Sequence, residues 1–368
     1  MILQIVPRAP GGRDGVGDYA RTLAVCLERI NGCKTTFVSA APSAALKTGG
    51  LEVLSPLSGI SAEQWRHHPW MAIVLHYVNY GYHRRGVPCW LPGKLRHLQR
   101  LCPGRLITIF HELYASGSWW QSAFWLRSTQ MRITRAIARL SDLSIVSSDV
   151  LCEQLHCLAP NALILVRPVF SNFGEPVLAP EQIVSRDPHR WVICGGTELI
   201  ERSLRSLLNR RQSVSEPFAP RELFVVGGAD RSAICKTLTD NSDIAAHYLP
   251  NVDVAIASGV LMSCTFGWID YFERADVPTA AILKSTTFAA YCAHGVIPIF
   301  PCEGSRIALH GDALPGPFFV TEADHYLPKD VERPAIAVRT YEWYRRNASS
   351  EQLAGGVASA LGFAPVAL

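Results

Sequence analysis

The 368-residue sequence has no apolar run near the ~18 residues that a membrane-spanning helix needs. No basic region precedes the short apolar run in MILQIVPRAP and no cleavage site follows it, so we expect a first strand there rather than a signal peptide. The chain also lacks an acidic tail and a disordered block. With 48% hydrophobic and 18% charged residues, its composition is typical of a globular protein with a large core.

A cysteine-based metal site or disulfide framework is also missing from the sequence. The eleven cysteines form no C-x-x-C pair, and the spacing of Cys292 and Cys302 from nearby histidines matches no metal-binding pattern. Scattered thiols of this kind are typical of a reducing compartment. We therefore expect a cytoplasmic protein in which no metal ion is held by cysteine.

Basic charge is concentrated in one segment. The net charge is only +4, yet no acidic residue occurs between Arg127 and Arg139. Just before this segment, SWWQSAFWLRS contains four large aromatic residues, Trp119, Trp120, Phe124 and Trp125. Aromatic side chains followed by arginines favour an interface with anionic lipid, so one interpretation is peripheral contact with a membrane. The alternative is a helix that packs on the core and has a solvated basic face.

Short β-rich runs alternate with helical stretches in both halves of the chain, which predicts an α/β fold with two doubly wound parallel sheets. The stretch that begins at Arg167, RPVFSNFGEPVLAPEQIVSRDPHR, carries four prolines and no periodicity, so it predicts a linker. The predicted strands are Thr36–Ser39, Ala72–Val78, Leu106–Phe110, Leu143–Ser147 and Leu163–Val166, then Trp191–Cys194, Leu223–Val226, Thr265–Ile269, Val296–Phe300 and Phe318–Val320.

A glycine-rich turn follows the first apolar run. RAPGGRDGVGDYARTLAVCLERI places four glycines in seven residues, and the apolar residues after them recur at the spacing of one helical face. Such a strand-to-helix turn leaves the first N–H groups of the helix open to an anion. It also serves as a tight reversal alone, and neither the G-x-G-x-x-G pattern nor a Walker lysine is present. The candidate residues here are Gly15, Val16, Gly17, Asp18 and Tyr19.

Polar and aromatic residues follow several other predicted strands. In the first half two histidines end neighbouring runs, and their aromatic neighbours suit a sugar, which has apolar ring faces and hydroxyl edges. These first-half candidates are His76, Tyr77, Tyr80, His111 and Glu112. In the second half, glycines again follow strands in CGGTELIERSLRSLL and VVGGADRS, and a lysine precedes hydroxyl residues in ILKSTTF. The second-half candidates are Thr197, Arg202, Gly228, Asp270, Tyr271, Lys284 and Ser285.

The segments DGVGDYARTLA, FHELY, RPVFSN and FAAYCAHGVIPI resemble bacterial glycosyltransferases of the GT-B architecture, most closely the family 4 type that acts on surface polysaccharides and glycolipids. The resemblance implies two Rossmann-like doubly wound domains that face each other across a cleft. It assigns residues 1–172 to an acceptor-side domain, 173–189 to a linker and 190–340 to a nucleotide-sugar-binding domain. Residues 341–368 form a C-terminal helical segment that can pack back on the first domain.

The resemblance also implies roles for individual residues. The glycine loop contacts the donor phosphates or the acceptor, and His111 lies beside the reacting sugar, where it can donate a hydrogen bond. The basic pair of the family falls near Thr197 and Arg202, of which only Arg202 is basic. The Glu-x7-Glu signature falls near Ile282 and Ala290, neither of which is acidic, and the nearest substitutes are Lys284 and Ser285.

We therefore predict a glycosyltransferase, of hexosyltransferase type and retaining, that moves a sugar from a nucleotide sugar to a glycan or lipid-linked acceptor. The predicted catalytic residues are His111, Asp18 and Lys284. No cofactor, metal ion or nucleic-acid partner is expected, and the chain has no D-x-D triplet. Two alternatives remain. An NAD-dependent oxidoreductase is disfavoured because no acidic residue ends Thr36–Ser39, and an inactive nucleotide-sugar-binding relative would explain the missing glutamates.

Overall fold

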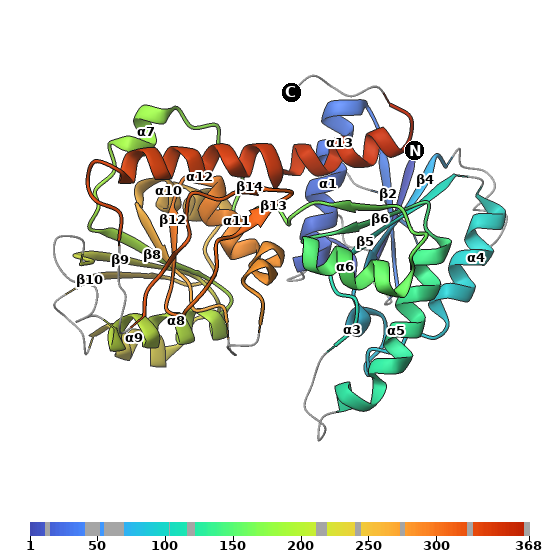
Figure 1. Ribbon diagram of the computed structural model, residues 1–368, viewed down its shortest axis with the longest axis horizontal. Coiled ribbons are helices and arrows are strands. Elements are labelled where there is room, and N and C mark those ends of the chain that lie inside the picture. The colour runs from blue at the N-terminus through green and yellow to red at the C-terminus, as the bar shows by residue number, and fades with distance from the viewer. Residues whose placement is uncertain are drawn as a thin grey trace. The chain divides into compact units, whose positions relative to one another are not determined.

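The computed structural model describes residues 1–11, 15–40, 52–54, 70–102, 104–115, 122–210, 219–239, 244–272, 277–321 and 327–363. The chain divides into two compact units, which we describe separately. Unit 1 comprises Met1–Pro168 and Ser350–Leu368, and unit 2 comprises Val169–Ser349. Each unit contains a parallel sheet with helices on both faces, so the predicted α/β fold with two Rossmann-like units is confirmed (Figure 1).

Unit 1 contains a seven-stranded parallel sheet in the order β3-β2-β1-β4-β5-β6-β7. Its strands are β1 (Ile2–Val6), β2 (Thr35–Ser39), β3 (Glu52–Leu54), β4 (Ala72–Tyr77), β5 (Arg105–Phe110), β6 (Leu143–Val146) and β7 (Ile164–Val166). Its helices are α1 (Gly15–Asn31), α3 (Asn79–Tyr82), α4 (Leu91–Leu101), α5 (Ser122–Leu140), α6 (Asp149–Leu158) and α13 (Ser350–Ala360).

The strands of unit 1 are apolar and buried because helices cover both faces of the sheet. Right-handed crossovers place α1 on one face and α4, α5 and α6 on the other. Helix α13 packs on α1, where the guanidinium of Arg29 lies 2.6 Å from the carboxylate of Glu351. Helix α13, the last helix among the described residues, therefore belongs to the same unit as the first strand.

Unit 2 contains a six-stranded parallel sheet in the order β10-β9-β8-β11-β12-β15, and a two-stranded sheet of β13 and β14. Its strands are β8 (Arg190–Gly195), β9 (Glu222–Gly227), β10 (Ala245–Leu249), β11 (Phe266–Trp268), β12 (Ile297–Phe300), β13 (Ala308–Leu309), β14 (Asp312–Ala313) and β15 (Phe318–Phe319). Its helices are α7 (Pro180–Val184), α8 (Thr197–Asn209), α9 (Ser232–Thr239), α10 (Val254–Ser263), η1 (Thr279–Lys284), α11 (Thr286–Ala293) and α12 (Arg333–Asn347).

The boundaries of the units differ from the predicted ones at the linker and at α12. The proline-rich segment is hydrogen-bonded to the hydroxyl groups of two tyrosines on α12. Tyr344 accepts a hydrogen bond from the Ser171 N–H at 2.9 Å, and Tyr341 accepts one from the Leu178 N–H at 3.1 Å. All of residues 173–189 therefore belong to unit 2, and the chain returns to unit 1 only at Ser350.

Candidate functional site

In each sheet the strand order reverses at one place, and most of the predicted site residues lie there. The reversal falls between β1 and β4 in unit 1 and between β8 and β11 in unit 2. In doubly wound folds, crossovers leave this place in opposite directions, which opens a crevice outside the carboxyl ends of the strands. Each unit therefore has its own candidate site.

The two glycines at the start of α1 have different surroundings. Gly15 is exposed, and an added Cβ would meet no atom within 4 Å. Gly17 is buried, and its Cβ would lie 3.3 Å from Cα of Pro10 and 3.5 Å from the carbonyl oxygen of Ala9. Gly17 thus allows the first helical turn to pack against the loop after β1. Gly15 leaves that turn accessible from outside.

The next residues of the glycine turn divide between surface and core. Val16 and Asp18 are half-buried, and the backbone carbonyl of Asp18 accepts a hydrogen bond from the Thr22 hydroxyl at 3.1 Å. Tyr19 is buried and turns its ring toward the two histidines predicted from the strand ends. The ring centroids of Tyr19 and His111 lie 4.9 Å apart in an edge-to-face arrangement, and those of Tyr19 and His76 lie 6.0 Å apart.

The two histidines are hydrogen-bonded to each other. Nδ1 of His76 lies 3.3 Å from Nε2 of His111, and the rings are nearly parallel, with centroids 5.6 Å apart. Nε2 of His76 lies 2.7 Å from Oε1 of Gln4, a residue that the sequence analysis did not select. The sequence does contain a feature that could have identified Gln4: it is a glutamine in the middle of the apolar strand ILQIV, where a buried amide needs a hydrogen-bond partner.

Burial keeps both imidazoles neutral at physiological pH. Desolvation lowers the pKa of His111 to about 4. Desolvation, and secondarily the charge of His111, lowers the pKa of His76 well below its ordinary value. Each ring then offers one hydrogen-bond donor and one acceptor, so the pair is suited to orienting hydroxyl groups rather than to neutralising an anion.

The other predicted residues of unit 1 do not join this group. Tyr77 has no exposed surface and packs its ring edge on Phe110 with centroids 5.4 Å apart. Because side chains alternate along a strand, Tyr77 projects from the face of the sheet opposite to His76. In this structure it is a core residue with no surface for a substrate. Tyr80 and Glu112 are exposed.

In unit 2 the ends of β8 and β9 come close together at glycines. Gly195 and Gly227 have φ angles of +133° and +97°, and a Cβ on Gly227 would lie 2.7 Å from the carbonyl oxygen of Gly195. Gly228, with φ +67°, continues this turn. The Thr197 hydroxyl accepts a hydrogen bond from the Ala229 N–H at 2.8 Å and so ties the turn after β9 to the start of α8.

The N-terminus of α8 has no side-chain cap. Its N-cap residue is Gly196, where an added Cβ would meet nothing within 4 Å. The first N–H groups of a helix have no intrahelical partner, and with such a cap they stay open to an anionic ligand. The start of α11 lies beside this turn, since a Cβ on Gly195 would lie 2.8 Å from Oγ1 of Thr287.

Lys284 and Ser285 precede α11. The Ser285 hydroxyl caps the helix by accepting a hydrogen bond from the Phe288 N–H at 3.3 Å, so this serine has a structural role. Lys284 is exposed at the end of η1, one residue before the cap. Lys284 is therefore an exposed basic residue within two positions of the N-terminus of α11.

Arg202 does not lie free for a diphosphate. Its Nε donates to the carbonyl oxygen of Asp270 at 2.7 Å, and its Nη2 donates to that of Tyr271 at 3.2 Å. The Asp270 carboxylate is 3.9 Å from Nε. Arg202 therefore holds the segment after β11 against α8. The three predicted residues Arg202, Asp270 and Tyr271 do lie together, but the guanidinium of Arg202 is used in contacts within this cluster.

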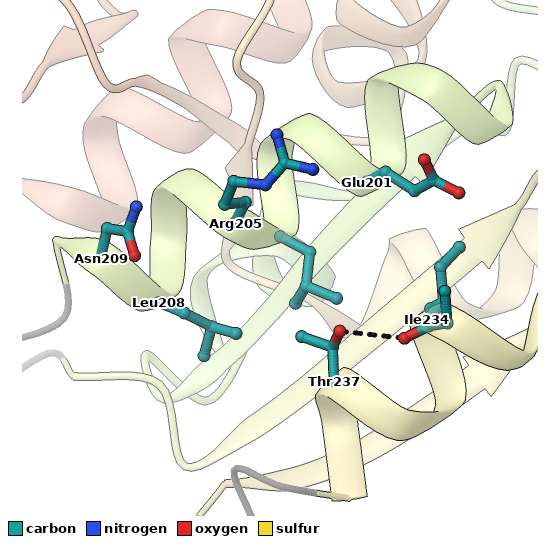
Figure 2. A pocket seen from close by; sticks show the side chains of 8 residues that line it. Glu201, Arg205, Leu208, Asn209, Ile234 and Thr237 are labelled. Atoms are coloured by element: carbon teal, nitrogen blue, oxygen red, sulfur yellow. Dashed lines mark hydrogen bonds between the residues drawn. The ribbon is translucent and has the colours of Figure 1, made fainter.

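A pocket of about 450 Å³ lies between α8 and α9 (Figure 2). Arg205 and Glu201 line it from α8, and Thr237 lines it from α9. None of the site residues predicted above lines this pocket. Within the described ranges, no group of three or more histidine, cysteine, aspartate or glutamate residues could hold a metal ion.

The sequence matches no protein-family model and no curated protein. Solved structures similar to the whole chain include an alpha-glucosyltransferase in complex with UDP (TM-score 0.61, 10% identity, 98% and 99% of the two chains covered). A second is described as trehalose-6-phosphate from E. coli bound with UDP-2-fluoro glucose (TM-score 0.58, 10% identity, 99% and 100% of the two chains covered). A third is WaaG, a glycosyltransferase involved in lipopolysaccharide biosynthesis (TM-score 0.53, 11% identity, 97% and 99% of the two chains covered). The chain therefore has the GT-B fold, as the sequence predicted.

Proposed function

We propose that the protein is a glycosyltransferase that moves a hexosyl group from a nucleotide sugar to a hydroxyl of a glycan or lipid-linked acceptor. The observation that carries this proposal is the uncapped N-terminus of α8, which lies where the strand order of the unit 2 sheet reverses in a GT-B fold. The UDP and UDP-2-fluoro glucose bound to similar structures support a nucleoside diphosphate sugar as the donor.

The donor diphosphate is assigned to unit 2. The uncapped N-terminus of α8 at Gly196 offers backbone N–H groups, and exposed Lys284 offers a cation. When the bond between the anomeric carbon and the phosphate oxygen breaks, its electron pair leaves with the nucleoside diphosphate. Helix N-termini and a lysine stabilise that charge. We therefore propose transfer without a metal ion, in which these groups take the place of a divalent cation.

Retention of the anomeric configuration is part of the proposal. An inverting transfer needs a general base that removes the proton of the incoming hydroxyl, with a pKa close to the working pH. Burial lowers the pKa of His111 to about 4, so this imidazole is a weak base for that role. Neutral His111 is instead assigned to hydrogen bonding with sugar or acceptor hydroxyls, whereas His76 has no exposed surface.

A lipid-linked acceptor is supported by the exposed face of α5. Trp125 is 69% exposed, and Arg132, Arg135 and Arg139 are also exposed and fall on one side of the helix by their spacing. We propose that this stripe binds anionic lipid headgroups and holds the protein at a membrane surface. Among the residues that the structure describes, no helix has both the length and the apolar character that crossing a membrane requires.

Ligand-induced stabilisation tests the donor assignment directly. The melting temperature is measured with UDP, GDP, ADP, their hexose conjugates and NAD. One nucleotide bound at a hundredfold excess over its Kd stabilises a protein by about 2.7 kcal/mol. We expect at least one nucleoside diphosphate to raise the melting temperature, and Gly196→Ala to reduce that rise. The exchange at this N-cap should cost the free protein about 1 kcal/mol or less, so the rise is compared with the variant's own melting temperature without ligand. Stabilisation by NAD alone would point to an oxidoreductase.

A further inference from the structure

A row of three polar side chains crosses the sheet of unit 1. Gln4 on β1 pairs in register with Val74 on β4, so His76, two residues further along β4, projects from the same face. His76 pairs with Ile109 on β5, and His111, two residues beyond, continues the row at the carboxyl end of that strand. Gln4 and His76 have no exposed surface, whereas His111 is half-buried.

The hydrogen bonds of this row fix where the protons lie. In the assigned amide orientation, Oε1 of Gln4 faces Nε2 of His76 at 2.7 Å, and because a carbonyl oxygen only accepts, the proton of His76 is assigned to Nε2. Nδ1 of His76 then carries a lone pair and accepts a hydrogen bond from Nε2–H of His111 at 3.3 Å. The proton of His111 is thereby held on Nε2, and its Nδ1 presents a lone pair. In the described part of the chain, that Nδ1 has no hydrogen-bond partner.

We propose that Gln4 and His76 are positioning residues that keep the proton of His111 on Nε2, so that Nδ1 of His111 accepts a hydrogen bond from a hydroxyl group of the bound sugar or acceptor. This inference rests on the glycosyltransferase function proposed above. It reverses the expectation from the sequence that His111 donates a hydrogen bond. The direction matters because a neutral imidazole has a single donor, and His76 already uses it.

The placement of Gln4 supports this role. An amide in the middle of a buried parallel strand is costly unless its polar atoms are paired, and an aliphatic residue would fit the strand better. Oε1 of Gln4 lies 2.7 Å from Nε2 of His76, whereas the buried amide nitrogen of Gln4 has no hydrogen-bond partner among the described residues, so the strand bears the cost of one unpaired amide group to keep this contact. The ring of Tyr19 packs edge-on against both imidazoles and fixes their planes, so the row can transmit one proton arrangement from the core to the crevice.

The test is the tautomer of each histidine, read from the nitrogen chemical shifts of ¹⁵N-histidine-labelled protein without substrate. The signals are assigned with His76→Gln and His111→Gln. We expect Nε2–H and a lone pair on Nδ1 for both residues. In Gln4→Leu, the buried Nε2–H of His76 would have no acceptor, so both protons should move to Nδ1. The matched control is Ser144→Ala, which removes another buried polar atom of the same sheet and should leave both tautomers unchanged.

Transfer kinetics provide the second readout. Groups that orient metal-bound histidines typically account for about 10- to 100-fold in activity, and we expect an effect of that size for this histidine: Gln4→Leu should lower kcat by that factor while the melting temperature stays close to wild type. A proton on Nδ1 of His111 in the wild-type protein would overturn the proposal, as would a Gln4→Leu variant with unchanged tautomers. A protein with the expected tautomers and no transfer activity would contradict the proposed function but leave the proton arrangement intact.

Discussion

Replacing Gly15 or Gly17 by alanine tests whether the start of α1 binds a ligand or has only a structural role. Gly15 is the first residue of the helix, has no positive φ and faces open space, so alanine fits there without strain. Alanine is favoured over glycine in a helix by about 0.5–1 kcal/mol, and less at the first position. For a unit of this size, 1 kcal/mol corresponds to about 2–4 °C, so we expect Gly15→Ala to raise the melting temperature by about 1–2 °C.

Gly17→Ala should act in the opposite direction. Its Cβ would lie 3.3 Å from Cα of Pro10, so the backbone of the loop must move by a few tenths of an ångström. Overpacking of this kind costs about 1–3 kcal/mol, which exceeds the gain in helix propensity. Gly17→Ala should therefore melt earlier than wild type, and a loss of activity in this variant would not by itself indicate a ligand site.

The activity of Gly15→Ala decides the question. If a substrate approaches the exposed backbone at Gly15, the added methyl group obstructs it, and kcat/KM for sugar transfer should fall about tenfold or more in a protein that is slightly more stable. The assays are a melting curve and steady-state kinetics for both variants. A Gly15→Ala variant that melts higher and transfers sugar at the wild-type rate would refute a ligand-binding role for this turn.

Three further predictions follow from single features. Lys284→Ala should raise the Kd for UDP or GDP about tenfold or more, whereas Lys236→Ala, an exposed lysine on α9, should not; equal affinities in a calorimetric titration would remove Lys284 from the site. The double variant Arg132→Gln/Arg135→Gln on α5 should reduce co-sedimentation with anionic phospholipid vesicles more than the control Arg96→Gln/Arg100→Gln on α4. Equal losses would indicate that binding depends on the overall positive charge and not on the face of α5. Burial lowers the pKa of His111 and of His294 to about 4, so the unfolded chain binds more protons than the folded one between about pH 6.5 and 4. The urea midpoint should therefore fall as the pH is lowered from 7.5 to 5, and should fall less in His294→Asn; a midpoint that rises at pH 5 would contradict this sign.

Much of the fold could be predicted because buried parallel strands are continuous apolar runs. The predicted strands all occur, whereas β3, β10, β13 and β14 were not predicted. β10 was missed because Ala245–Leu249, AAHYL, is short, half-exposed and only weakly apolar. The linker was predicted from its prolines, but its attachment to unit 2 depends on Tyr341 and Tyr344 of a distant helix. Contacts of this kind leave no local pattern in the sequence.

The candidate site was only partly predictable for the same reason. The spacing of strands and glycine turns correctly placed His76 and His111 near the start of α1. It did not reveal that Tyr77 projects from the opposite face, nor that Arg202 uses its guanidinium within the protein. Gln4 was overlooked because its role depends on a side chain more than seventy positions away.

Turnover of a nucleotide sugar is the most direct test of the central claim. Release of nucleoside diphosphate is measured for a panel of nucleotide hexoses with EDTA present, with acceptor glycolipids or by slow donor hydrolysis. We expect at least one donor to be turned over, and His111→Ala to lower kcat/KM about 100-fold while His97→Ala, an exposed histidine on α4, has no effect. Turnover that appears only when magnesium or manganese replaces EDTA would contradict metal independence, and equal rates for the two variants would contradict the assigned site. A chain that neither binds nor turns over any nucleotide sugar would contradict the claim itself.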